Sequence, residues 1–376
     1  MTDNIEKAKR LHGKGRYTEA EELYAQVVAS NARDPEALYL LGTLLGQRGK
    51  FDEALIFLER AVNESPKNSV YHCNLGVIEH NLKRLEQAKI SFLLAINLNN
   101  KNVDAHYNLA KLYKELGSTD AALSSYEIVL SLEPSHLNAL INLGNILVDV
   151  GRLGDAIIQF KKVIELNPKD ILALVNLGNV YRRMGLAEKA IDTYGRVLSF
   201  HAHDGLRIRS AVTLPVVYKS LDHIKEVRES LALKLEKLLE EDLEVSDPSL
   251  ETSTTNFFLA YQNYNDRDLQ EIIAKIHLNS CSRLGWNAPH CNGVKRGRGK
   301  IKIGFLSAYF YRHSVGRMMV GLISQIPKDL FEVVVITNKG QKDSIALKIA
   351  LSTSLRELSL KGTLLLNQLK TERREK

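Results

Sequence analysis

Small and large apolar residues return every 34 positions along the first two hundred residues of the chain. An alanine marks each period, inside a segment that reads as the start of a helix, as in FDEALIFL. A large apolar side chain comes four positions after each alanine, and another small residue stands twelve positions before it. The alanines are Ala20, Ala54, Ala88, Ala122, Ala156 and Ala190; the large residues are Tyr24, Leu58, Phe92, Tyr126, Phe160 and Tyr194; the earlier small residues are Ala8, Gly42, Gly76, Ala110, Gly144 and Gly178.

This register predicts six pairs of packed helices. Small residues where two helices cross let their backbones approach to about 8–10 Å, and the large side chain fills the space beside them. A residue at positive φ is expected between the two helices of each repeat. Glycine stands there in five repeats, and Lys83 takes its place in the third. Pro66, Pro134 and Pro168 share a further phase, between one pair and the next.

A single helix pair cannot bury its own apolar face, so the pairs are expected to stack. Stacking with a small rotation produces a superhelix whose concave groove is lined by the first helix of each pair. The pattern closely resembles the tetratricopeptide repeat family over residues 5–200. We therefore expect a mainly α fold, a right-handed tetratricopeptide superhelix, with a groove that binds protein or peptide.

Asparagine recurs on the first helices with the same spacing. Asn74, Asn108, Asn142 and Asn176 are 34 residues apart, and Asn145 and Asn179 extend the same face. An amide offers both donors and an acceptor, so this ladder is able to pair with a peptide backbone without reading its sequence. The alternative is that asparagine at this site serves folding alone. The sequence does not decide between the two.

Beyond the repeats the chain changes character twice. Residues 206–242 read as helices interrupted at Pro215 that cap the array, residues 244–256 as a polar loop or linker, and a helix follows Asp266. The run KRGRGK at 295–300 looks like a boundary. The expected domains are 1–200, six repeats; 201–294, a helical cap and connecting region; and 295–376, a different fold.

An α/β unit is expected to begin at Ile301. IKIGFLS and FEVVVITN are suited to two buried parallel strands, and the segment after Ser314, a candidate helix cap, is helical. KDSIALKIA and LRELSL continue the alternation that is typical of a Rossmann-like domain. The segment contains neither GxGxxG nor GxxxxGK, so no phosphate-binding loop is placed on it.

Composition narrows the classes of protein. The longest apolar runs are far shorter than the roughly 20 residues of a transmembrane helix, and the first residues lack the apolar core of a signal peptide, so we expect a cytoplasmic protein without a membrane partner. Cys73, Cys281 and Cys291 have no CxxC spacing, which supports neither a disulfide framework nor a metal site.

Charge is spread unevenly along the chain. Residues 295–376 contain 17 Lys and Arg against 6 Asp and Glu, a net charge of +11, whereas the first 294 residues carry −4. Such a segment is suited to binding an anion such as a nucleotide diphosphate or a nucleic acid. The alternative is a basic surface that is simply solvated, and on charge alone this alternative is favoured. No nucleic-acid partner is expected.

The C-terminal segment resembles a particular enzyme family. The NLG repeats, then AYQNYNDRDLQE, then KIKIGFLSAYFYRHSVGRMMVGLISQIPKDLFEVVVIT, are similar to the O-GlcNAc transferases and SPINDLY-like glycosyltransferases, most strongly over residues 301–337. The resemblance implies that 295–376 is part of the N-terminal lobe of a GT-B domain with two Rossmann-like lobes. It also implies transfer of a sugar to Ser or Thr of proteins that the repeats recruit, without a metal or a permanently bound cofactor.

The resemblance singles out His313 as the catalytic candidate. It matches the family's histidine near the transferred sugar, which acts as general base or positions the acceptor hydroxyl. Tyr309 and Arg317 depart from the animal enzymes, which carry an acidic residue and a second histidine there, and fit the bacterial SPINDLY-like branch better. The donor is therefore UDP-GlcNAc or, as a second choice, GDP-fucose.

Two functions remain from the sequence. The first is the protein O-glycosyltransferase, of which this chain resembles the front half because LLLNQLKTERREK ends before the family's donor-binding lobe. The second is a noncatalytic adaptor whose repeats bind proteins. The oligomeric state is open, and a homo-oligomer is among the possibilities.

Residues 1–376 alone are expected to bind neither UDP-GlcNAc nor GDP-fucose and to transfer no sugar. A diphosphate needs oriented backbone N–H groups or a basic clamp, and in the family the second lobe supplies this site. Attraction by the +11 segment is screened at about 0.15 M salt and does not orient a sugar. Calorimetric titration with both nucleotide sugars and a radiolabelled transfer assay test this expectation. Micromolar binding that is lost in His313→Ala, or any turnover, would contradict it.

Overall fold

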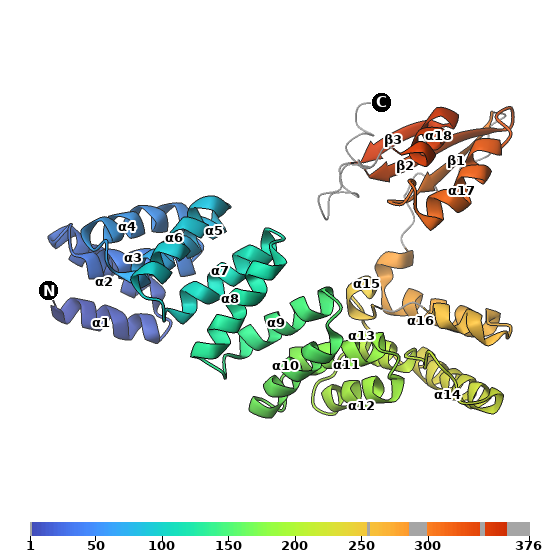
Figure 1. Ribbon diagram of the computed structural model, residues 1–376, viewed down its shortest axis with the longest axis horizontal. Coiled ribbons are helices and arrows are strands. Elements are labelled where there is room, and N and C mark those ends of the chain that lie inside the picture. Colours follow the sequence, from blue (N-terminus) through green and yellow to red (C-terminus); the bar gives the residue numbers. More distant parts are fainter. Residues whose placement is uncertain (1, 254–255, 286–298, 339–342, 359–376) are drawn as a thin grey trace. The chain divides into compact units, whose positions relative to one another are not determined.

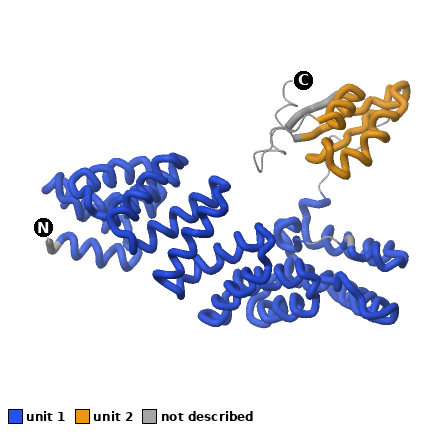
Figure 2. The backbone as a smooth tube through the Cα atoms, in the orientation of Figure 1, with its two compact units in different colours: residues 1–286 blue, residues 287–376 orange. Residues whose placement is uncertain are grey.

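The chain forms two compact units, residues 1–286 and residues 287–376 (Figures 1 and 2). The computed structural model describes residues 2–253, 256–285, 299–338 and 343–358. The elements are α1 (Thr2–Gly13), α2 (Tyr17–Ser30), α3 (Pro35–Gln47), α4 (Phe51–Glu64), α5 (Ser69–Asn81), α6 (Leu85–Leu98), α7 (Val103–Glu115), α8 (Thr119–Leu132), α9 (Leu137–Asp149), α10 (Leu153–Leu166), α11 (Ile171–Arg183), α12 (Ala187–Leu198), α13 (Asp204–Ala211), α14 (Leu221–Leu239), α15 (Pro248–Glu251), η1 (Phe257–Gln262), α16 (Arg267–Ser280), η2 (Ser282–Gly285), β1 (Ile301–Leu306), α17 (Ser314–Gln325), β2 (Phe331–Asn338), α18 (Ser344–Ser352) and β3 (Ser354–Leu358).

Helices α1 to α12 are the six helix pairs that the 34-residue register predicts. The two helices of each pair pack on one another, and each second helix also packs on the first helix of the next pair. First helices of neighbouring pairs touch as well, α3 with α5, α5 with α7 and α9 with α11. The first helices therefore lie on the inner side of the array's curvature, where neighbours come closest.

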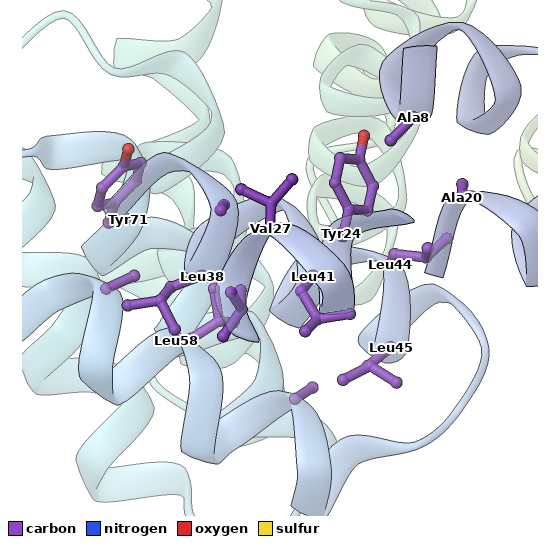
Figure 3. Close-up of a cluster of buried hydrophobic side chains, with 14 of the residues drawn as sticks. Ala8, Ala20, Tyr24, Val27, Leu38, Leu41, Leu44, Leu45, Leu58 and Tyr71 are labelled. Atoms are coloured by element: carbon purple, nitrogen blue, oxygen red, sulfur yellow. The ribbon is translucent and has the colours of Figure 1, made fainter. Parts of the chain in front are cut away.

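Each crossing of two paired helices joins a small residue to a large buried one. A Cβ atom added at Gly144 would lie 2.7 Å from Phe160 Cε1, and one added at Gly76 would lie 2.8 Å from Phe92 Cδ1. Real carbon atoms do not approach this closely, so a side chain here would push the helices apart. Figure 3 shows the first such cluster, in which Ala8, Ala20 and Tyr24 gather with leucines of α3. The large residues are almost completely buried in every repeat: Tyr24, Leu58, Phe92, Tyr126, Phe160 and Tyr194.

A periodic capping residue starts the first helix of repeats two to six. It precedes the helix by one position, and its side chain accepts a hydrogen bond from a backbone N–H of the first turn, as Asp34 does from Glu36 and Ala37 at 3.0 Å. The caps are Asp34, Asn68, Asn102, His136 and Asp170. Their 34-residue spacing is visible in the sequence and would have fixed these helix starts.

The ends of the first helices follow the glycine prediction, including its exception. The five glycines between paired helices have φ between 73° and 83°, and Lys83 adopts the same left-handed conformation with φ 61°. That conformation costs a residue with a Cβ roughly 1–2 kcal/mol. Lys83 Nζ lies 3.1 Å from Glu115 Oε1 in an exposed ion pair, which returns at most about 1 kcal/mol.

Helices α13 to α16 cap the last repeat. Leu206 of α13 is buried with Leu174 and Tyr194 of the sixth repeat, and the helical interruption predicted at Pro215 falls between α13 and α14. The helix expected after Asp266 is α16, which buries Ile273 and Ile276 against α14. Because the cap shares its core with the repeats, both belong to one compact unit.

The composition of the polar segment 244–256 had suggested a loop or linker. In the structure it is more than a simple linker. Within its described residues Val245 and Thr252 are buried, and the carbonyl groups of residues 250–252 accept hydrogen bonds from Arg209. Composition misled because the segment is held through its backbone, and backbone groups are the same in every sequence.

The second unit contains a parallel sheet in the order β1-β2-β3. Val333 and Val335 of β2 are buried with Ile323 of α17 and Ile349 of α18, so both helices pack on the same face of the sheet. The strand–helix–strand alternation is as predicted, but β1 is not buried: Leu306 is 63% exposed. Strand β1 lies at an edge of the described sheet, and every second residue of it points to the face opposite the helices. Within the described residues of this unit, the three strands and the helices on one face are fewer elements than a doubly wound lobe has.

Replacing Gly144 by leucine should destabilise the middle of the array by about 1–3 kcal/mol, because overpacking a close crossing forces the helices apart. Thermal or urea unfolding measures the effect. Gly154→Leu is the matched control, since Gly154 lies in α10 with open space around its Cβ position. It should be neutral or slightly stabilising because glycine is a poor helix former. Equal melting curves for the parent and Gly144→Leu would refute the assigned register.

Replacing Lys83 by glycine should stabilise the chain relative to Lys83→Ala. Both variants lose the ion pair with Glu115, but only alanine keeps the strain of a Cβ at positive φ. The difference in free energy of unfolding should be about 1 kcal/mol in favour of glycine. Urea titration of the two variants measures it. A more stable alanine variant would mean that the backbone relaxes out of the left-handed region at no cost.

Candidate functional site

The four ladder asparagines lie half-buried on the first helices α5, α7, α9 and α11, and each contacts the preceding repeat. Asn74 Nδ2 donates to Tyr39 Oη at 2.8 Å, and Asn142 Nδ2 donates to Tyr107 Oη at 3.1 Å, in each case 35 residues back. Asn108 occupies the same place in the register and lies beside Cys73 of the preceding repeat. The ladder therefore links neighbouring repeats.

The last ladder position differs because the residue 35 positions before Asn176 is Ile141, whose side chain has no oxygen to accept a hydrogen bond. Asn176 Nδ2 donates instead to Asn145 Oδ1, 31 residues back, at 2.9 Å. Asn74 makes the corresponding second bond to Thr43 Oγ1 at 3.3 Å. In each of these bonds the amide nitrogen is used and the oxygen is not. Sequence reasoning placed these residues on one face. It did not predict that their side chains also form hydrogen bonds to residues of the preceding repeat.

A pocket of about 470 Å³ lies at the C-terminal end of the ladder. Asn145, Asn176 and Asn179 form one side, so the extension of the ladder to Asn145 and Asn179 lies in this pocket. Another side is formed by residues 212–214, Val216 and Phe258 of the cap, and Arg182 and Arg183 of α11 also line the pocket. Sequence reasoning missed this site because the cap residues approach the repeat only in the folded chain.

A buried arginine holds the cap against the sixth repeat beside this pocket. Arg209 of α13 is 5% exposed and has no carboxylate partner within the described ranges of the chain. Its guanidinium donates to the carbonyl oxygens of Leu250, Glu251 and Thr252 at 2.6–2.9 Å and to Asn179 Oδ1 at 3.0 Å. Four carbonyl dipoles thus stabilise the buried charge, although burial still lowers the pKa of Arg209.

The same network fixes the orientation of the Asn179 amide. Tyr194 Oη also donates to Asn179 Oδ1, at 2.8 Å. A guanidinium only donates, so the amide atom beside Arg209 must be the oxygen. The Asn179 NH2 group is therefore left for the pocket. The sequence did indicate Asn179, because it continues the asparagine ladder. Its two hydrogen-bond partners, Tyr194 and Arg209, were not predictable from residue spacing.

His313 lies at the carboxyl end of β1, where its ring caps α17. Its Nδ1 accepts a hydrogen bond from the Val315 N–H at 3.3 Å. The predicted cap Ser314 is instead the first residue of α17, one position further on, because the imidazole takes the capping role. An accepting Nδ1 requires the neutral ring to carry its proton on Nε2. In this arrangement Nε2 carries the hydrogen and is able to donate a hydrogen bond to a ligand.

Two features hold the His313 loop in place. The Tyr309 ring stacks on the imidazole with centroids 4.6 Å apart, and Asp343 accepts a hydrogen bond from the Arg312 N–H while capping α18. Gly316 lies so close to the carbonyl oxygen of Tyr311 that a Cβ would clash with it. The glycine of the HSVGR sequence thus has a packing reason of its own.

Among the described residues, thiols and metal-ligating side chains form no further cluster. Cys73 and Cys281 are free and buried, and burial raises the pKa of Cys73 to about 12; Cys291 lies outside the described residues. No group of three or more His, Cys, Asp or Glu suited to a metal was found in the parts of the chain that the structure describes. Of the helices described, none combines the length and apolar character needed to cross a bilayer.

The helix pairs and their inner face define the class of protein: a superhelical repeat scaffold of the kind that mediates protein–protein interaction. Tetratricopeptide repeat models match residues 5–69, 70–102, 91–124 and 173–205, and a TPR repeat model matches residues 144–185. The repeat region of the chain belongs to the tetratricopeptide repeat family. The matching models do not reach residues 301–337, on which the resemblance to glycosyltransferases rests.

Similar solved structures include tetratricopeptide repeat proteins. A thermophilic TPR protein of Thermus thermophilus has 26% sequence identity and a TM-score of 0.42, covering 48% of this chain and 97% of its own. A tetratricopeptide repeat protein from Parabacteroides merdae has 19% identity and a TM-score of 0.47, covering 73% and 98%. PilW, a widely conserved type IV pilus biogenesis factor, has 17% identity and a TM-score of 0.50, covering 53% and 92%. Comparison with curated proteins found no match.

Proposed function

We propose that the chain is a protein-binding scaffold that holds an extended segment of its partner along the asparagine ladder. The observation that carries this proposal is the common orientation of the ladder amides. The nitrogens of Asn74, Asn142 and Asn176 are engaged by the preceding repeat, so the oxygens remain to accept N–H groups of a ligand backbone.

The inter-repeat bonds also serve binding. They hold the amides in place before a ligand arrives, which reduces the conformational entropy lost on association. Backbone recognition is independent of side chains, so the ladder suits many partners. Structural and binding roles are therefore compatible, although the sequence had presented them as alternatives.

Replacing both Asn108 and Asn142 by alanine should weaken the binding of several unrelated peptides by similar factors, about 1 kcal/mol for each hydrogen bond lost. Fluorescence polarisation with labelled peptides measures the affinities. The double variant should also unfold at slightly lower urea, since the bond from Asn142 to Tyr107 is lost.

Asn97→Ala is the matched control, because Asn97 is an exposed asparagine of a second helix, α6. It should leave peptide affinity unchanged. Unchanged affinity in the folded double variant would show that the ladder asparagines serve only to join the repeats.

We propose glycosyl transfer as the second candidate function, because His313 stands at the carboxyl end of a parallel strand, where ligands of α/β sheets bind. The reaction would join Ser or Thr Oγ of a protein to C1 of a sugar and release the nucleoside diphosphate of UDP-GlcNAc or GDP-fucose. With its proton on Nε2, His313 would position the acceptor or the leaving diphosphate by donating a hydrogen bond.

The transfer assay with both nucleotide sugars tests this second candidate. Turnover that falls in His313→Ala would support it and would contradict the expectation that residues 1–376 alone transfer no sugar, whereas absence of turnover with either donor agrees with that expectation and with the scaffold. His313→Asn tests the role of the ring, because an amide still donates a hydrogen bond but accepts no proton. Retained turnover in the asparagine variant supports positioning, and a loss as large as in the alanine variant supports a general base.

A further inference from the structure

The pocket at the end of the ladder offers mainly hydrogen-bond donors. Asn179 Oδ1 is occupied by Tyr194 and Arg209, and Asn145 Oδ1 by Asn176. Both amides therefore present NH2 groups. Arg182 and Arg183 commit one nitrogen each to the carbonyl oxygens of Ser253 and Val148, at 3.1 and 2.9 Å, and retain further N–H groups.

The pocket is also positively charged. The residues that line it include Arg182 and Arg183 but no Asp or Glu. Neither arginine forms an ion pair within the described residues of the chain, and buried Arg209 adds its charge behind Asn179. A ligand group with several acceptor atoms and negative charge fits these donors best.

Comparison between repeats shows that folding does not require this charge. At the position of Arg183, counted from the small residue of the first helix, the fourth and fifth repeats carry Glu115 and Asp149. At the position of Arg182 the fifth repeat has Val148. These repeats form the same helices, so the two arginines are a property of this site rather than of the fold.

An apolar wall lies beside the donors. Val216 and Phe258 of the cap line the pocket and remain 46% and 40% exposed. Side chains of this size are able to bury an apolar group of a ligand and gain from its transfer out of water. The ligand therefore has an anionic part and an apolar part close together.

We infer that this pocket binds an acidic side chain and a neighbouring apolar side chain of the protein segment held by the ladder. The inference rests on the proposed scaffold function. Asn145 and Asn176 belong to both the ladder face and the pocket, so a segment that runs along the ladder reaches the arginines. The ladder then binds any backbone, and the pocket selects among partners.

A peptide selection tests the inference on the full 376-residue chain. Random peptide segments, each about as long as the ladder, are displayed within a phage coat protein, so that no free C-terminal carboxylate is present. Acidic residues adjacent to large apolar ones should be enriched. In the best segment, made as a peptide blocked at both ends, Glu→Gln or Asp→Asn should weaken binding about tenfold, the usual effect of losing a charge-assisted hydrogen bond.

Charge reversal provides the matched test. Arg183 is exposed, so the Arg183→Glu variant should fold normally. Its affinity for the acidic peptide should be about tenfold or more lower than that of the parent protein. Its affinity for the Glu→Lys peptide should be higher than that of the parent protein. Arg196→Glu, an equal change of charge at an exposed residue of α12 outside the pocket, should leave the affinity unchanged. Equal losses in both variants would mean a general charge effect and overturn the site.

The remaining outcomes separate the two proposals. Enriched segments without an acidic preference, whose binding still depends on Asn108 and Asn142, would overturn the pocket and leave the scaffold function standing. Binders that appear only in a library with free C-terminal carboxylates would overturn the assignment to an acidic side chain. If no segment is enriched in either library, the scaffold function fails and the pocket inference with it.

Discussion

The contact between a small residue of each first helix and a large buried side chain of the second sets how closely the helices of every repeat approach. Gly144 against Phe160 shows how little room is left, since even a methyl group would lie 2.7 Å from the ring. The same contact repeats through the array, so consecutive pairs stack with nearly constant geometry. That regularity places side chains of successive first helices at fixed spacing on the inner face. The asparagine ladder and its inter-repeat hydrogen bonds depend on it.

The end of the array combines this regular surface with an irregular one. The cap packs on the sixth repeat through Leu206 and through Arg209, whose buried charge is stabilised by backbone carbonyl groups rather than by a carboxylate. Because Arg209 also holds the Asn179 oxygen, the junction that joins cap and array also orients a donor toward the pocket. Stability and the proposed recognition of an acidic residue therefore share one hydrogen-bond network.

The second unit carries a different kind of candidate site. His313 ends the loop after β1, caps α17, and is stacked by Tyr309. These contacts hold the ring in place, and a capping Nδ1 leaves Nε2 as the nitrogen that is able to donate to a ligand. The glycosyltransferase proposal thus rests on a defined geometry at one residue together with a resemblance in sequence, and the protein-binding proposal rests on the repeats.

The sequence by itself determined the repeat architecture. Periodic features such as Ala20, Gly49 and Asp34 act within one repeat or between neighbours, and local physics at a fixed spacing is readable from a single chain. Lys83 is the exception to the glycine pattern in the sequence, and the structure shows that it adopts the same left-handed conformation. The sequence also placed the ladder asparagines on one face and His313 after a strand. Only the tertiary structure decided which atom of each amide is free, that Arg209 pairs with carbonyl groups of residues 250–252, and that the cap forms a pocket with Arg182 and Arg183. The contacts of Arg209 and Arg182 join residues some 30 to 70 positions apart without periodicity, and many of them use backbone atoms that are identical in every residue, so no pattern of side chains predicts them.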